Sequence, residues 1–192
     1  MTINATVYSL GFIHSNLILR TNVKIAIPNC EMEPNMNPDL SIKMQSGRFN
    51  YRVGAIIQHE NHLLMAKNAG DNFYYTIGGR VKFGESVEDT ILRETYEETG
   101  LPLEIDRLAF FHENFFTYTS TQEQFHELCL FFLMKPCDGL SQIRQSFNED
   151  YGEVSIHWLP INNLHEYELF PQFFKTAQLD MPYIQHIVTR DL

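Results

Sequence analysis

Carboxylates are concentrated in one short stretch near the middle of this sequence. Six of the fourteen residues from 85 to 98 are Asp or Glu, and one is Arg. If this stretch is helical, Glu94, Glu97 and Glu98 share one face, because side chains three and four positions apart lie about 5–6 Å from each other. Hard divalent cations such as Mg²⁺ take carboxylate oxygens together with substrate phosphates. The spacing therefore indicates either a cation site on one face of a helix or an acidic helix face exposed to solvent.

The spacing of the whole stretch narrows these alternatives. With five residues in the first gap and seven in the second, the fixed positions are Gly79, Glu85, Arg93, Glu94, Glu97, Glu98, Gly100 and Leu101. This pattern resembles the Nudix box, the signature of the Nudix hydrolase family. It departs from the box at Thr95, where the family usually has an aliphatic residue and where the side chain faces the predicted core. The resemblance is specific over residues 79–101 and looser over the flanking strands.

The resemblance implies a divalent metal site, with Mg²⁺ or Mn²⁺ as the ion. Glu94 and Glu98 are the implied metal ligands, and Glu97 is a further ligand or the base that acts on water. The family also uses a main-chain carbonyl just before the box glycine, which here belongs to Gly78. A Gly-Gly turn suits this role, because a backbone without side chains can approach an ion closely.

Two further groups of residues follow from the resemblance. Arg93 and Glu85 are implied to form an ion pair that braces the loop against the helix as part of the catalytic apparatus. Family members often add an acid from outside the box. Glu127 and Glu153 are the candidates in this chain, and each is alternatively an ordinary surface acid.

Aromatic residues after the box bear on the substrate. Tyr118 lies seventeen positions past Leu101, where family members that act on diadenosine polyphosphates tend to have a Tyr. Phe116 stands where ADP-ribose-type members tend to carry a Pro. Both side chains could stack on a nucleotide base, or they could be core or edge aromatics. The sequence leaves the base and the leaving group open.

The implied activity is that of a metal-dependent pyrophosphohydrolase, which cleaves a nucleoside diphosphate linked to another moiety by attack of water on phosphorus. A bound cation serves such chemistry by neutralising phosphoryl oxygens and acidifying water. The alternative is a catalytically silent Nudix-like module that binds a nucleotide as a sensor or regulator. The intact set of box acids favours the hydrolase, because a pure binder has no need of these carboxylates.

The elements that must position these residues are predicted to be strands around a few helices. Ser86 as N-cap, Asp89 three residues later and Gly100 at the end predict a helix over the box. Apolar and Phe-rich runs predict strands on both sides, and residues 161–174 are predicted to form a second helix. This order favours a mixed α/β (α+β) domain. The resemblance implies a Nudix-like α/β/α sandwich with a mixed β-sheet.

The chain is predicted to divide into an N-terminal extension, residues 1–43, and a Nudix-like hydrolase domain, residues 44–192. Residues 28–39 are rich in Pro and Asn, which indicates a linker. The extension could be a docking strand, a dimerisation arm, or sequence that lies upstream of a working start at Met44, and its apolar character is compatible with a homodimer.

Charge and cysteine content exclude several classes of protein. The 14 Lys and Arg residues against 24 Asp and Glu residues leave a net charge of −10, which excludes a nucleic-acid binder held by a basic face. Three cysteines without a CxxC motif form neither a disulfide framework nor a zinc cage. The N-terminus carries no Lys or Arg before Arg20, unlike a secretory signal, and its apolar run is interrupted. We therefore expect a cytoplasmic protein with a small nucleotide as its partner and no membrane contact.

Overall fold

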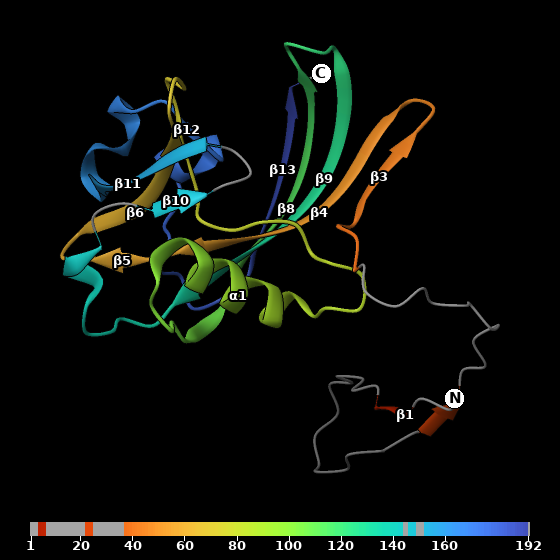
Figure 1. Cartoon of the computed structure of the whole chain (residues 1–192), viewed down its shortest axis with the longest axis horizontal. Coiled ribbons are helices and arrows are strands. Elements are labelled where there is room, and N and C mark those ends of the chain that lie inside the picture. The colour runs from red at the N-terminus through yellow and green to blue at the C-terminus, as the bar shows by residue number, and fades with distance from the viewer. Residues whose placement is uncertain (1–3, 7–21, 25–36, 144–145, 149–151, 192) are drawn as a thin grey trace. The chain divides into compact units, whose positions relative to one another are not determined.

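The computed structural model describes residues 4–6, 22–24, 37–143, 146–148 and 152–191 of the chain. The chain divides into two compact units, Met1–Met36 and Asn37–Leu192. In the first unit, β1 (Asn4–Thr6) pairs with β2 (Asn22–Lys24) in antiparallel orientation. All other described elements belong to the second unit (Figure 1).

Two mixed sheets make up most of the described part of the second unit. The first sheet has the strand order β13-β8-β9-β4-β3, and β4 runs parallel to β9. Its strands are β3 (Ser41–Met44), β4 (Gly47–Ile56), β8 (Ile105–Tyr118), β9 (Glu123–Met134) and β13 (Gln185–Asp191). The second sheet has the order β10-β11-β6-β7-β12, and β5 pairs with β6 outside this path. Its strands are β5 (Gln58–His59), β6 (His62–Asn68), β7 (Tyr74–Tyr75), β10 (Ser146–Asn148), β11 (Gly152–Pro160) and β12 (Leu169–Phe170).

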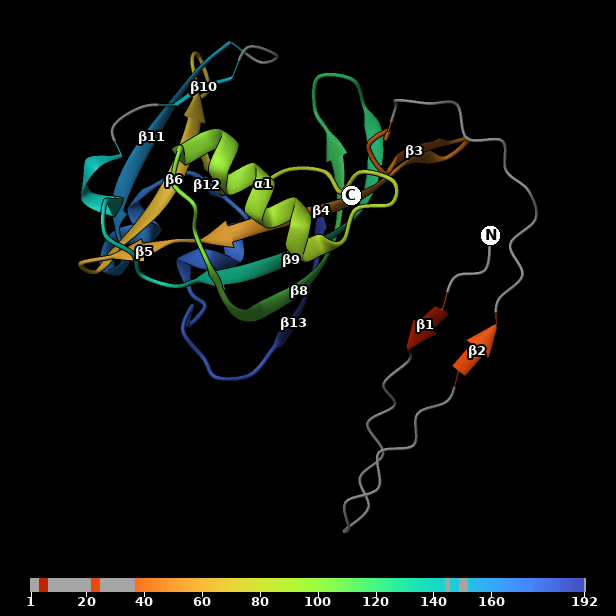
Figure 2. The ribbon, with the colours of Figure 1, turned by 60° about the horizontal axis from the view of Figure 1, so that its bottom comes forward.

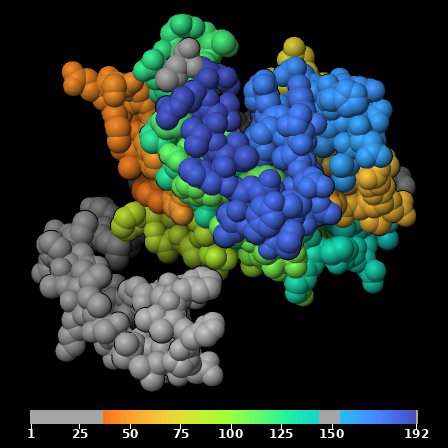
Figure 3. All heavy atoms as spheres, turned by 180° about the vertical axis from the view of Figure 1, so that it is seen from behind, coloured from red at the N-terminus to blue at the C-terminus, as the bar shows by residue number. Residues whose placement is uncertain are grey.

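Alternating apolar residues build one core on each face of these sheets. On β4, Val53 belongs to one core and Ile56 to the other, and on β6 Leu64 and Met65 divide in the same way. This period of two is typical of strands buried on both faces. The first core includes Ile91 of α1 (Val87–Thr99), which lies along one side of the strands (Figure 2). The second core is covered by the segment that follows β11, coloured blue in Figure 3.

The helix α1 begins and ends where the sequence predicts. The Ser86 hydroxyl accepts the Asp89 N–H at 3.0 Å and donates to the Asp89 carboxylate at 2.8 Å, which caps the first turn. Gly100 ends the helix in the left-handed conformation, with φ at 73°. The prediction of this helix is confirmed.

Thr95 is fully buried on the core side of α1. Its hydroxyl donates to the Ile91 carbonyl at 2.7 Å, one turn earlier in the same helix. Because this bond satisfies the hydroxyl within the helix, the residue fits the core at a position where an aliphatic side chain is usual.

The prediction of a second helix over residues 161–174 is wrong. This segment contains the 3-10 helix η2 (Ile161–Glu166), the short strand β12 and the 3-10 helix η3 (Gln172–Lys175). Pro171 explains the break, because it lacks an N–H and disfavours a helical conformation for the residue before it. The segment still supplies apolar side chains to the second core, namely Leu164, Leu169 and Phe174.

The described elements confirm the predicted mixed α+β class, with α1 on one side of the sheets and the 3-10 segments on the other. The hairpin of β3 and β4 joins Ser41 to Asn50, so the first sheet begins before residue 44. The role predicted for residues 1–43 stays a prediction. In the part of the chain that the structure describes, none of the helices has both the length and the apolar character needed to cross a membrane.

Candidate metal and catalytic site

The acidic face of α1 lies against the turn formed by Gly78 and Gly79. This turn runs beside β4, where the Val53 N–H donates to the Gly79 carbonyl at 2.9 Å. A Cβ atom at Gly79 would lie 2.3 Å from the carboxyl group of Glu94. The two glycines therefore allow the helix and β4 to approach each other closely at the carboxylates.

Glu98 is the most deeply placed of the three predicted metal ligands. Burial, reinforced by the nearby negative charge of Glu94, raises the pKa of Glu98 to about 8. A backbone hydrogen bond from Gly78 and the positive charge of Arg52 act in the opposite direction and are weaker. The Glu98 Oε2 atom is buried and has no hydrogen-bond partner among the described residues. A buried carboxylate oxygen without a partner is a favourable place for a cation.

Arg93 connects three of the other predicted residues, Glu85, Glu94 and Glu97. It forms a two-bond pair with Glu85, at 2.8 Å and 3.0 Å, and a further Arg93 nitrogen contacts Glu94 at 2.7 Å and Glu97 at 3.2 Å. The hydrogen bonds from Arg93 lower the pKa of Glu85 to about 2. Arg93 thus ties the loop before α1 to the acidic face of the helix.

Glu94 and Glu97 differ in their surroundings. The Glu94 side chain is 16% exposed, and burial raises its pKa in spite of the contact with Arg93. The Glu97 side chain is 54% exposed. Glu94 thus faces the interior beside Gly79, whereas Glu97 stands at the solvent side of the same face.

The residues of this face fit a hard divalent cation. Carboxylate oxygens are the ligands that Mg²⁺ and Mn²⁺ prefer, and the unpartnered Oε2 atom of Glu98 offers one of them. In the present arrangement, no three His, Cys, Asp or Glu side chains of the described residues converge as ligands, and Glu94 and Glu97 contact Arg93 instead.

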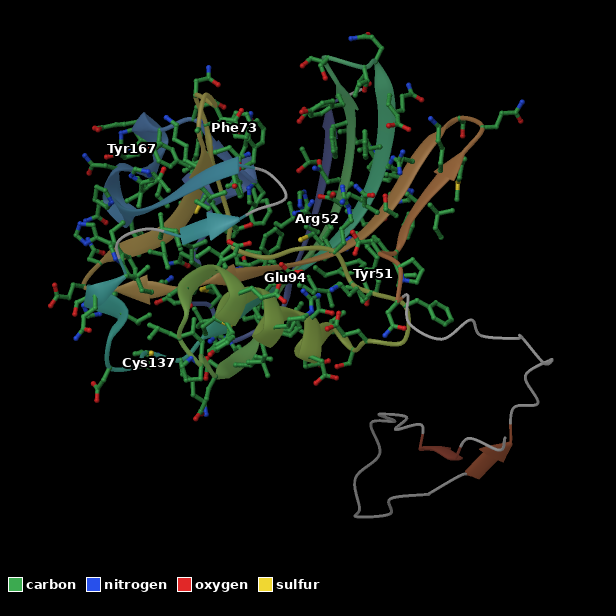
Figure 4. The ribbon with its side chains drawn as sticks, viewed as in Figure 1. Tyr51, Arg52, Phe73, Glu94, Cys137 and Tyr167 are labelled. Atoms are coloured by element: carbon green, nitrogen blue, oxygen red, sulfur yellow. The ribbon has the colours of Figure 1, made fainter. Side chains whose placement is uncertain are left out.

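Glu127 of β9 reaches this neighbourhood through Arg52. Its carboxylate accepts from the side-chain amide of Asn50 at 3.3 Å and lies 3.9 Å from the Arg52 Nε atom. Figure 4 shows Arg52 and Glu94 near each other in the middle of the domain, and the Arg52 charge acts on both Glu94 and Glu98. Glu127 therefore lies close to Arg52, whose charge in turn acts on the carboxylates of α1.

The NUDIX domain family matches residues 48–178, which is more than half of the chain. This chain belongs to the NUDIX family. The NAD-capped RNA hydrolase NudC of Actinobacillus succinogenes is 36% identical over 67 residues, which cover 35% of this chain and 24% of that protein. A MutT-like protein of Streptomyces ambofaciens is 30% identical over 62 residues, or 32% of this chain and 40% of that protein. The matched stretch thus spans less than half the length of these curated relatives.

A solved structure resembles the NUDIX domain of this chain as a whole. The crystal structure of a MutT protein from Bacillus halodurans aligns with a TM-score of 0.54 and 16% sequence identity, over 74% of this chain and 90% of that one. At this level of identity, the likeness concerns the fold.

Other predicted residues of the NUDIX domain lie apart from the acidic face or outside the description. Tyr118, at the end of β8, is 53% exposed, and Phe116 stacks on Phe125 of β9 with ring centres 4.9 Å apart. The described contacts of these rings do not reach the carboxylates of α1. Glu153 pairs through its backbone with Phe147, and its side chain lies outside the described residues. The roles of these residues stay predictions.

Three residues beside the predicted ones belong to no recognised motif in the sequence: Arg52, Arg80 and Asn50. A signal for Arg52 exists, because it is the one charge in the apolar run from Arg52 to Gln58. Arg80 directly follows the Gly78-Gly79 pair. These signals become meaningful only once the pairing of β4 with the glycine turn is known.

We expect Glu85→Gln to destabilise the NUDIX domain by about 2–3 kcal/mol at neutral pH, because it removes the charge that Arg93 binds. The Glu85 pKa is lower in the folded chain than its ordinary value of 4.5, so its contribution is present above that value. The difference between variant and wild type should therefore shrink as the pH falls from about 4.5 toward 2. Urea unfolding in neutral and acidic buffer measures this.

The matched control for this prediction is Glu104→Gln, which breaks an exposed pair with Lys135 at 3.0 Å. An exposed pair contributes about 0–1 kcal/mol, so this change should have little effect. Equal losses for the two variants would contradict the bracing role of Glu85.

Proposed function

We propose that this chain is a metal-dependent pyrophosphohydrolase that cleaves a nucleoside diphosphate linked to another moiety. Membership of the NUDIX family supports the reaction class, and the relative named NAD-capped RNA hydrolase supports it further. The observation that carries the proposal is the carboxylate face of α1, where the buried Glu98 Oε2 atom has no hydrogen-bond partner among the described residues and lies beside Glu94 and the glycine turn.

Glu94, Glu98 and the Gly78 carbonyl would hold Mg²⁺ or Mn²⁺ in this proposal, and of the two roles open to Glu97, ligand or base, the exposed side chain takes that of the base. A bound divalent cation supplies neutralisation of phosphoryl oxygens and acidification of water. In the reaction, the oxygen of water bonds to phosphorus, the bridging P–O bond breaks, and the leaving phosphate carries away the bonding electrons.

The side chains of the chain itself divide the remaining tasks. Glu97 is the exposed carboxylate of the face and accepts the proton that the attacking water loses. Arg93 and Glu85 hold the loop and the helix in register, so that the glycine turn and the carboxylates keep their positions. Glu127, whose carboxylate lies 3.9 Å from the Arg52 Nε atom, is the additional acid of this proposal.

The partner in this proposal is a small nucleotide substrate, and the site of action is the cytoplasm. The surplus of acids makes binding of nucleic acid through a basic face implausible on electrostatic grounds. A homodimer that uses residues 1–43 as an arm is part of the same proposal. Size measurement in solution with and without residues 1–36, which leaves β3 in place, tests it.

The function is tested by incubating the wild-type chain with nucleoside diphosphate derivatives, dinucleoside polyphosphates and nucleoside triphosphates, with Mg²⁺ and with a chelator. Isotopically labelled water identifies the phosphorus that is attacked. Mg²⁺-dependent turnover with label in one phosphate product supports the proposal. Tight nucleotide binding without turnover would replace it by the silent binding module.

A further inference from the structure

Two arginines lie directly opposite each other at the edge of the carboxylate site. Arg52 on β4 and Arg80 after the glycine turn are antiparallel partners, flanked by backbone hydrogen bonds of 2.9 Å and 3.0 Å. In such a pair the two side chains leave the same face, with Cβ atoms about 4.5–5.5 Å apart. Like charges in this position repel each other, so the arrangement needs negative charge near both guanidinium groups.

The acids of the chain meet this need incompletely. The Arg52 Nε atom lies 3.9 Å from Glu127, and an Arg80 terminal nitrogen lies 3.5 Å from Asp39. Neither approach has the two-bond geometry of the pair between Arg93 and Glu85. The Arg80 Nε atom is buried and has no hydrogen-bond acceptor among the described residues. This pair of cations therefore has donors left over for an anion.

One member of the pair, Arg52, also lies close enough to the proposed metal ligands for its charge to act on them. The Arg52 charge acts on both Glu94 and Glu98, and Glu94 packs against Gly79, the residue before Arg80. An anion held by the two arginines would thus be adjacent to a cation held by the carboxylates. A diphosphate matches this arrangement, because one of its phosphates would contact the arginines while the other contacts the cation.

We propose that Arg52 and Arg80 together bind one phosphate group of a pyrophosphate-containing substrate, beside the carboxylates of α1. This inference rests on the proposed function and deepens it. Guanidinium groups suit the task, because each presents a planar fork of donors that matches phosphate oxygens. Phosphate has enough oxygens to serve both forks at once, whereas Glu127 and Asp39 each approach only one of the two arginines.

The test is binding of inorganic pyrophosphate, measured by titration calorimetry with and without Mg²⁺, to the full chain. Arg52→Met and Arg80→Met should each weaken binding roughly tenfold or more, because each removes charge-assisted hydrogen bonds. Arg48→Met is the matched control: Arg48 lies on the same strand, pairs with Glu123 at 3.4 Å, and should leave the affinity unchanged. In hydrolysis assays the two test variants should raise KM.

A misfolded variant would also lose affinity for pyrophosphate, so the test includes a variant that is expected to gain affinity. Asp39→Asn removes the acid that competes for Arg80, so it should bind pyrophosphate more tightly than the wild type. Wild-type affinity in both arginine variants would overturn the proposal, as would failure of the wild type to bind pyrophosphate in either buffer. Pyrophosphate binding that depends on the arginines, without hydrolysis of any substrate, would support the phosphate site and contradict the proposed hydrolase function. Hydrolysis that does not depend on the arginines would support the hydrolase function and contradict the phosphate site.

Discussion

Glu98→Gln is expected to lower kcat for the Mg²⁺-dependent reaction by roughly 10³-fold, with the fold intact. Glutamine keeps the shape of the side chain and removes the negative charge. The two oxygens of the carboxylate share the lost charge, and one of them, the buried Oε2 atom, has no hydrogen-bond partner among the described residues. Steady-state kinetics on the best substrate of the panel measures the effect, and circular dichroism confirms folding.

The same substitution has an opposite effect on stability. The Glu98 pKa is raised from 4.5 to about 8, so ionisation of this side chain opposes folding in metal-free buffer. The stability that the protonated form contributes is complete below about pH 4.5 and is lost as the pH rises through 8. Glu98→Gln should therefore gain stability over the wild type as the pH rises, measured by thermal unfolding with a chelator. A variant that grows less stable than the wild type in alkali would contradict the burial of this carboxyl group.

Gly78→Ala is expected to destabilise the domain by about 3–4 kcal/mol. The residue has a φ of 140°, and a Cβ atom there would lie 2.3 Å from the backbone oxygen of Val53. Both the strain and the clash are with main chain, which cannot rotate away as a side chain does. Denaturant unfolding measures the loss, and activity should fall with it, because the turn positions Gly79 against Glu94.

Gly84→Ala separates the strain of a positive φ from the clash with the main chain. Gly84 also has a positive φ, at 83°, but nothing lies within 4 Å of the place that a Cβ atom would take. This control should lose only the strain of the left-handed conformation, about 1–2 kcal/mol. If both variants lose the same free energy, the close approach of the turn to β4 is wrong.

Local signals in the sequence predict the bounds of α1 well. The cap at Ser86, the stop at Gly100 and the spacing of the acids depend only on neighbouring residues, and the structure shows the helix between the two caps. Apolar and Phe-rich runs likewise predict the long strands, since a strand that is buried on both faces of a sheet has a nearly continuous apolar sequence.

Pairing between distant segments could not be predicted in the same way. Arg52 and Arg80 become neighbours only because the glycine turn runs beside β4, and Glu127 reaches Arg52 only because β9 is parallel to β4. The misjudged segment 161–174 has a related cause. Its apolar residues have a spacing that a helix would also show, and they pack into the second core from 3-10 turns and a short strand.

The ion pairs of Arg93 bear on the order of folding and metal binding in the proposed enzyme. It gathers the carboxylates of Glu85, Glu94 and Glu97 around a positive charge that the polypeptide itself carries. Small zinc domains, by contrast, assemble only when their metal arrives. If this chain binds an ion as proposed, the scaffold would already be folded around Arg93, and the ion would replace Arg93 as the electrostatic partner of these carboxylates.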